Sequence, residues 1–71
     1  MQESKGYQLM LRKNTIENII ALLEQQFHTE TVRALTPMLQ NIDDLERLKY
    51  LLLAAVRVPN IEAFAQELID Q

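Results

Sequence analysis

The chain has 71 residues, a net charge of −3, 48% hydrophobic residues and no cysteine. This length allows one small domain and excludes a multidomain enzyme, and the absence of cysteine excludes disulfide frameworks and thiol chemistry. A single glycine, two prolines and 24% charged residues are not the composition of a disordered chain. We therefore expect residues 1–71 to form a single helical domain.

A long first helix is predicted from about residue 4 to residue 27. Its apolar positions 16, 20, 23 and 27 alternate in steps of four and three, which is typical of one helix face. Asn14 and Glu17 have the spacing of a capping box, so a start at residue 14 is an alternative. Because nothing between residues 7 and 13 breaks a helix, the longer helix is preferred.

A shorter second helix is predicted from about residue 30 to residue 40, with Val32, Leu35 and Leu39 on one face. Pro37 lies inside this range and lacks a backbone donor. It also disfavours helical geometry at the preceding residue. We therefore expect a kink at this point, or two short helical pieces.

Two further helices complete the prediction. The third begins after Asn41 and Asp43, which are candidate N-caps, and its apolar residues 45, 48, 52 and 55 keep the helical spacing. Pro59 ends it, and Asn60 can cap a fourth helix that runs from residue 61 to about residue 70. No alternating run indicates a strand, so the expected fold is all-α, a small bundle of about four helices.

Targeting segments and a nucleic-acid partner are not expected. The longest apolar run, residues 51–56, is shorter than the ~7–15 residues of a signal peptide or the ~20 of a membrane span. This run could line a ligand groove or form core, and core is preferred because a helix that is apolar on nearly every side is buried. We expect a cytoplasmic protein without membrane contact, since Arg12 and Lys13 alone do not make a membrane-binding basic face.

Charge is unevenly distributed along the chain. Residues 1–13 form a polar, basic segment with Lys5, Arg12 and Lys13 against Glu3, whereas residues 14–71 hold nine acidic and four basic residues. Such a balance is poorly suited to neutralising phosphates. We therefore do not expect this chain to bind nucleic acid directly.

Catalytic and metal-binding patterns are absent from the sequence. His28 is the single histidine, and one ligand does not make a transition-metal site; it is interpreted as a solvated residue at the end of the first helix. In the acidic segment 43–49, Asp43–Arg47 and Glu46–Lys49 have the spacing of helix surface pairs rather than of a metal-dependent nuclease. No hydroxyl has an activating base, so we expect no catalytic residue, no metal and no cofactor.

Self-association is the main functional prediction from the residues. A chain of this length buries only about 60% of its surface on folding, so its core is marginal. The first helix carries more apolar positions than one face requires, which favours a dimer through this helix or docking on a larger protein. The candidate residues are Leu9, Ile16, Ile19, Ile20, Leu23 and Phe27.

The segment from residue 14 onward resembles the helical C-terminal module of Rpn-like proteins, the recombination-promoting nuclease and transposase-related family. The similarity lies in LLEQQF at 22–27 and in two short motifs. In the first motif Ile42, Asp43, Asp44, Leu45, Glu46 and Leu48 match, and in the second Ile61, Glu62 and Phe64. One departure is His28, where the family usually has glycine.

The resemblance implies an accessory module, because the nuclease domain of that family lies upstream of these helices. It transfers no catalytic residue to this sequence. Two function classes follow. The preferred one is a non-catalytic oligomerisation or protein-interaction module accessory to an Rpn-like protein, and the alternative is a small nucleic-acid-associated regulator linked to a transposon or a toxin–antitoxin pair.

Overall fold

The computed structural model describes residues 2–70 and, from residue 6 onward, their side chains. Four helices follow one another: α1 (Gln2–Gln26), α2 (Thr29–Gln40), α3 (Leu45–Arg57) and α4 (Ile61–Ile69). No strand occurs between residues 2 and 70. The predicted all-α bundle is therefore confirmed, and α1 is the long helix expected from the sequence, without a break at Asn14.

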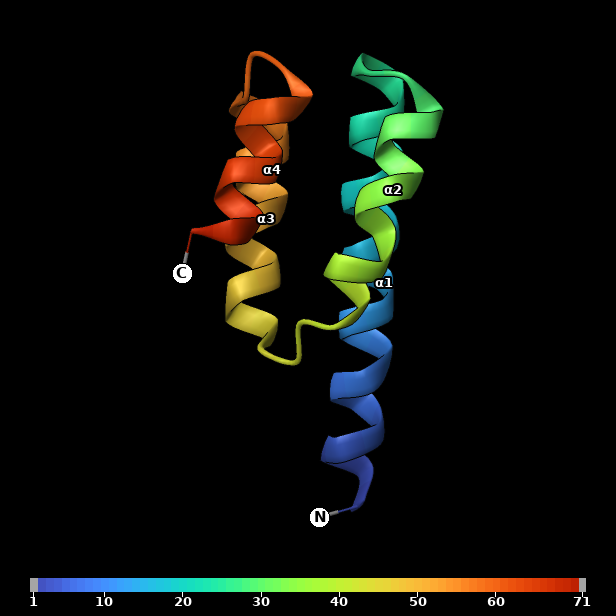
Figure 1. Ribbon diagram of the computed structural model, residues 1–71. Helices are drawn as coiled ribbons and strands as arrows, with labels where there is room; N and C mark the ends of the chain where they lie inside the picture. The colour runs from blue at the N-terminus through green and yellow to red at the C-terminus, as the bar shows by residue number, and fades with distance from the viewer. Residues whose placement is uncertain (1, 71) are drawn as a thin grey trace.

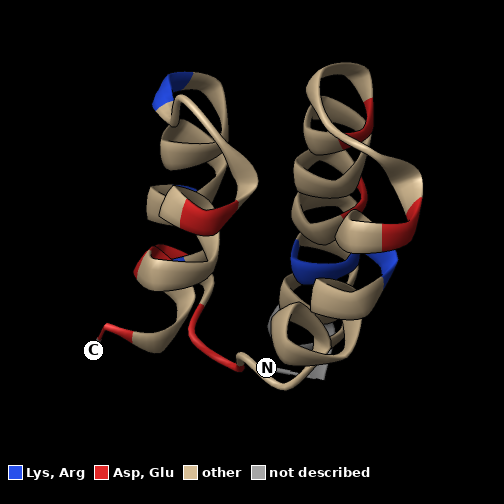
Figure 2. Ribbon diagram, turned by 45° about the horizontal axis from the view of Figure 1, so that its top comes forward, with Lys and Arg blue, Asp and Glu red and all other residues tan. Residues whose placement is uncertain are grey.

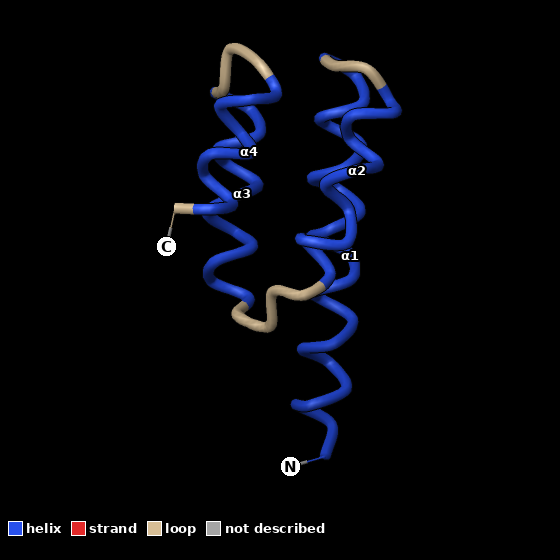
Figure 3. The backbone as a smooth tube through the Cα atoms, viewed as in Figure 1, coloured by secondary structure: helices blue, strands red, loops and turns tan. Residues whose placement is uncertain are grey.

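The helices run alternately up and down, as Figure 1 shows. Connections of only two to four residues join them, and short connections place consecutive helices antiparallel. As a result α1 and α3 run in the same direction and pack along much of their length. The first turns of α1 extend beyond the loop between α2 and α3, which gives the molecule an elongated shape with extents of 40 × 22 × 19 Å (Figure 3).

The caps of the last two helices are made by single side chains. The Asp44 carboxylate accepts a hydrogen bond from the Glu46 backbone N–H at 3.0 Å. Asp44 therefore caps α3, whereas the sequence pointed to Asn41 and Asp43; Asn41 instead ends α2. The amide oxygen of Asn60 accepts from the Ala63 backbone N–H at 2.8 Å, which confirms the predicted cap of α4.

Helix α2 continues through Pro37 as one element, so of the two predicted alternatives, a kink or two short pieces, the second is wrong. Proline removes only its own hydrogen bond to the carbonyl four residues earlier. The neighbouring bonds persist: the Asn41 N–H donates to the Pro37 carbonyl at 3.2 Å, and the Thr36 hydroxyl donates to the Val32 carbonyl at 3.3 Å. One missing bond near the end of a packed helix does not divide it.

The core lies where the four helices meet. Helix α1 contributes Ile16, Ile19 and Leu23 to it, and α3 contributes a face of leucines and alanines. Two long side chains fasten α1 to its neighbours: Arg12 donates to the Ile42 carbonyl, and Gln26 donates to the Ala55 carbonyl at 3.0 Å. The remaining buried residues are Val32, Leu39, Leu48, Leu51, Ala54, Ala55, Phe64 and Leu68.

Candidate interaction surface

The structure divides the six residues predicted for self-association. Three of them, Ile16, Ile19 and Leu23, are buried in the chain's own core. Ile20 and Phe27 are half-buried and pack against this core. Leu9 alone is largely exposed, at 55%, because it lies on the part of α1 near the end of the bundle. The apolar excess of α1 at these positions is thus used mostly inside the molecule.

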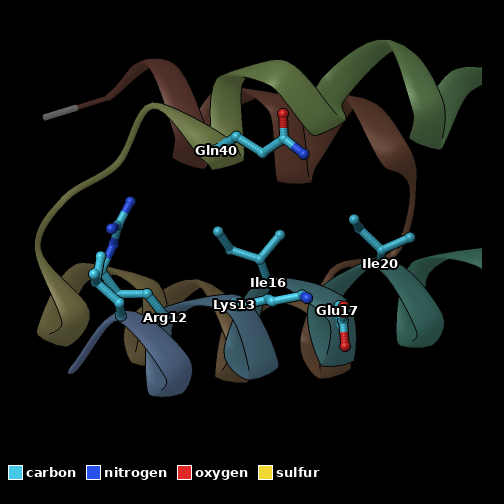
Figure 4. Close-up of a pocket in the computed structure, with 7 residues that line it drawn as sticks. Arg12, Lys13, Ile16, Glu17, Ile20 and Gln40 are labelled. Carbon is cyan, nitrogen blue, oxygen red and sulfur yellow. The ribbon is translucent and has the colours of Figure 1, made fainter. Parts of the chain in front are cut away.

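A shallow cleft lies beside Leu9, between α1 and the end of α2. Figure 4 shows Ile16 and Ile20 on α1 facing Gln40 on α2 across it. Lys13 and Glu17 lie along its rim. The cleft contains no histidine, hydroxyl nucleophile or pair of carboxylates, so its side chains offer packing and hydrogen bonding rather than acid–base chemistry.

Arg12, at one end of this cleft, joins α1 to the loop between α2 and α3. Its guanidinium donates two hydrogen bonds, of 3.2 and 2.9 Å, to the carbonyl oxygen of Ile42 in the loop between α2 and α3. It also lies 3.5 Å from a carboxylate oxygen of Asp43. The predicted Asp43–Arg47 pair is wrong, because Asp43 precedes the first turn of α3 and faces Arg12 instead.

The other charges of the acidic segment are also used within the fold. Glu46 and Lys49 form the predicted surface pair, with 3.9 Å between the charged atoms. Arg47 donates to the backbone carbonyls of Glu67 and Asp70 at the end of α4. Its guanidinium lies 5.8 Å from the centre of the Tyr50 ring. These contacts hold the end of α4 against α3, so the role of Arg47 in this fold is structural.

No group of three or more acidic or histidine side chains that could hold a metal ion occurs in the part of the chain that the structure describes. His28 is exposed in the turn between α1 and α2 and makes no side-chain capping bond. Basic residues are distributed over α1, α2 and α3 among acidic ones rather than gathered on one face (Figure 2). None of the helices between residues 2 and 70 could cross a membrane.

A second groove lies between α1 and α3, at the run of residues 51–56 for which core was preferred. It lies between Asn18, Ala21, Leu22 and Gln25 on one helix and Leu52, Leu53 and Val56 on the other, and we call it the α1–α3 groove. Leu22 and Leu52 are half-buried, whereas Leu53 and Val56 are 64% and 60% exposed. None of the seven lining residues is charged.

The exposure of Leu53 and Val56 corrects the interpretation of residues 51–56 as core throughout. Consecutive residues on a helix are separated by about 100°, so six in a row surround it, and α3 is packed on only part of its circumference. Leu51, Ala54 and Ala55 take the packed side. The signal was present in the sequence: an apolar run this wide must expose some members unless neighbours cover every side.

Comparisons of the chain with family models, with curated proteins and with solved structures find no match.

Proposed function

We propose that this chain is a non-catalytic protein-interaction module that self-associates through the α1–α3 groove. The observation that carries the proposal is the exposure of Leu53 and Val56 beside half-buried Leu22 and Leu52. Contiguous exposed apolar side chains on a small soluble domain mark interaction sites. Two of the longest charged side chains, Arg12 and Arg47, are held by backbone carbonyls of the fold.

Association would also raise the marginal stability of a 71-residue chain. Full burial of one Leu or Val side chain stabilises by about 1.5–3 kcal/mol, so covering Leu53 and Val56 adds a substantial fraction of the stability of so small a fold. Anything that binds only the folded state stabilises it by mass action. A partner on the groove therefore supplies apolar burial that the chain lacks alone.

The resemblance to the C-terminal module of Rpn-like proteins supports an accessory role. In this proposal the module joins copies of a transposase-related protein and performs no chemistry itself. Its matching residues would serve the fold: Asp44 caps α3, and Leu48 and Phe64 lie in the core. The interaction would then depend on residues outside the matching motifs, Leu53 and Val56.

Sedimentation equilibrium of the wild type and two variants tests the proposal. Over a concentration range of about a hundredfold, we expect the apparent mass of the wild type to rise from monomer to dimer. Leu53→Glu should stay monomeric with an unchanged circular dichroism spectrum, because a charge in the groove would be buried without a partner. The matched control is Ile69→Glu on α4, since Ile69 is also 64% exposed, and it should associate like the wild type.

Two outcomes would contradict the proposal. A wild type that remains monomeric at the highest concentration excludes self-association. Binding to random duplex DNA at low salt that weakens steeply with added salt would instead favour the nucleic-acid-associated regulator, because release of counterions from phosphates produces that dependence.

A further inference from the structure

The side of α1 that borders the groove is uncharged for most of its length. The residues Tyr7, Leu11, Asn14, Asn18, Ala21 and Gln25 follow one another in steps of four and three, which places them on one face of the helix. We call this face the α1 stripe. All but half-buried Leu11 are exposed. Three of these residues, Asn18, Ala21 and Gln25, also line the α1–α3 groove, so stripe and groove form one continuous surface.

From residue 6 onward, the exposed charged side chains of α1 lie elsewhere on the helix. Lys13, Glu17 and Glu24 are exposed, and their spacing of four and seven residues puts them on a separate face. A chain with a net charge of −3 meets a second copy most favourably through a surface that carries no charge. The absence of charge on the stripe therefore favours a copy of the same chain over a strongly charged partner.

The stripe also has a symmetry that suits antiparallel pairing. Read from either end, it presents a polar hydrogen-bonding residue, an apolar residue and then asparagine: Tyr7, Leu11, Asn14, and in reverse Gln25, Ala21, Asn18. A two-fold axis at the level of residue 16 would set Asn14 against Asn18 of the partner subunit and Leu11 against the partner subunit's Ala21. Like residues then meet like, and buried asparagine pairs are known to fix the register of paired helices.

The projecting start of α1 fits the groove of such a partner. Tyr7 and Leu11 lie as far from residue 16 in one direction as Gln25 and Ala21 do in the other, about 27 Å between the two ends at 1.5 Å per residue. The first of these segments passes beyond the bundle, and the second borders Leu53 and Val56 (Figure 1). In the pairing just described, the projecting turns of each copy cover the exposed leucine and valine of the other.

We propose that two copies of this chain pair antiparallel through the α1 stripe, with Tyr7 and Leu11 of each copy seated on the α1–α3 groove of the other. The inference rests on the proposed self-association and specifies its geometry. A face about 27 Å long and two helices wide has a projected area of about 430–540 Å², since packed helices lie 8–10 Å apart. Two such faces bury ~900–1,100 Å², the size of weak, concentration-dependent complexes.

Charge substitutions at the two asparagines test the register. Asn18→Lys places two like charges near the two-fold axis and should raise the dimer dissociation constant at least about tenfold. Adding Asn14→Asp should restore association, because antiparallel pairing sets the introduced carboxylate at position 14 of each copy against the introduced ammonium group at position 18 of the other. Parallel pairing would set like charges together and weaken the dimer further. Glu17→Lys lies off the stripe and is the control that should leave the dissociation constant unchanged.

Disulfide trapping gives an independent readout, because the natural chain has no cysteine. When Tyr7→Cys and Gln25→Cys proteins are mixed and oxidised, the proposal predicts cross-links between the two variants. Homodimers of the Gln25→Cys protein, together with failure of the double charge variant, would overturn the antiparallel pairing while leaving self-association intact. A monomeric wild type would overturn both proposals.

Discussion

Arg12 links the long first helix to a loop thirty residues away in the sequence. Its side chain is 19% exposed, and both of its hydrogen bonds reach one carbonyl oxygen. The carboxylate of Asp43 that it also meets is 96% exposed, so solvent screens that ion pair and little stability is expected from it. The stabilising contribution of Arg12 therefore lies in the two bonds to Ile42.

Replacing Arg12 by methionine should lower the free energy of unfolding by about 1.5–3 kcal/mol, because hydrogen bonds from a charged donor to a partly buried acceptor are lost. Lys13→Met is the matched control: Lys13 is adjacent and exposed, and its replacement should change stability by less than about 0.5 kcal/mol. Urea denaturation at fixed protein concentration measures both. Equal effects at the two positions would mean that the bonds to Ile42 contribute nothing specific.

Helix α2 shows how packing tolerates a residue that disfavours helix. Pro37 is exposed and lies in the last turns of α2, while Val32 and Leu39 anchor the helix in the core. The two anchors lie on either side of the missing hydrogen bond. Their burial holds α2 together because most helical stability in proteins comes from tertiary packing of the apolar face.

Pro37→Ala should therefore raise the free energy of unfolding, by less than about 2 kcal/mol. The regained helical hydrogen bond and the higher helix propensity of alanine stabilise the folded state, and the greater freedom of the unfolded chain offsets part of this gain. Ala34→Pro, one turn earlier on the same helix, should cost about 3 kcal/mol because it removes a bond in the helix interior. Thermal melts followed by circular dichroism compare the two. If Pro37→Ala instead lowers the free energy of unfolding by more than about 2 kcal/mol, the proline ring itself stabilises the native structure at this position.

A single small core supports all four helices of the molecule. Phe64 is the largest fully buried side chain, and α4, only nine residues long, depends on it for anchorage. The total stability of a 71-residue domain is on the order of 4–11 kcal/mol. Loss of one large core residue consequently approaches the stability of the whole fold.

Phe64→Ala should abolish the cooperative thermal transition or lower the free energy of unfolding by about 3–5 kcal/mol. Leu53→Ala, which shortens an exposed side chain on α3, should leave the monomer within about 0.5 kcal/mol of the wild type at concentrations too low for association. Differential scanning calorimetry at low concentration distinguishes them. A large loss for Leu53→Ala under those conditions would place Leu53 in the monomer's own packing.

The helices and most of their ends follow from local features of the sequence. The number of helices, the long first helix, the stop before Pro59 and the Asn60 cap are local properties, set by spacing, backbone geometry and short-range hydrogen bonds. The Asp44 cap and the continuity of α2 were not predicted. Several polar residues precede α3, and which of them caps it depends on where the loop held by Arg12 allows the first turn to begin.

Which apolar residues are core and which are surface depends on how the helices pack. Helix α1 is apolar on several sides, and local spacing favoured the seam of Ile16, Ile20, Leu23 and Phe27. In the bundle α1 must face α2 and α3 together, so Ile16, Ile19 and Leu23 point between them and become buried. In the same packing arrangement none of the described helices covers the side of α3 that carries Leu53 and Val56, so these residues are exposed. The direction in which an apolar helix points is fixed by where its neighbours lie, and that is a property of the assembled bundle rather than of any one segment.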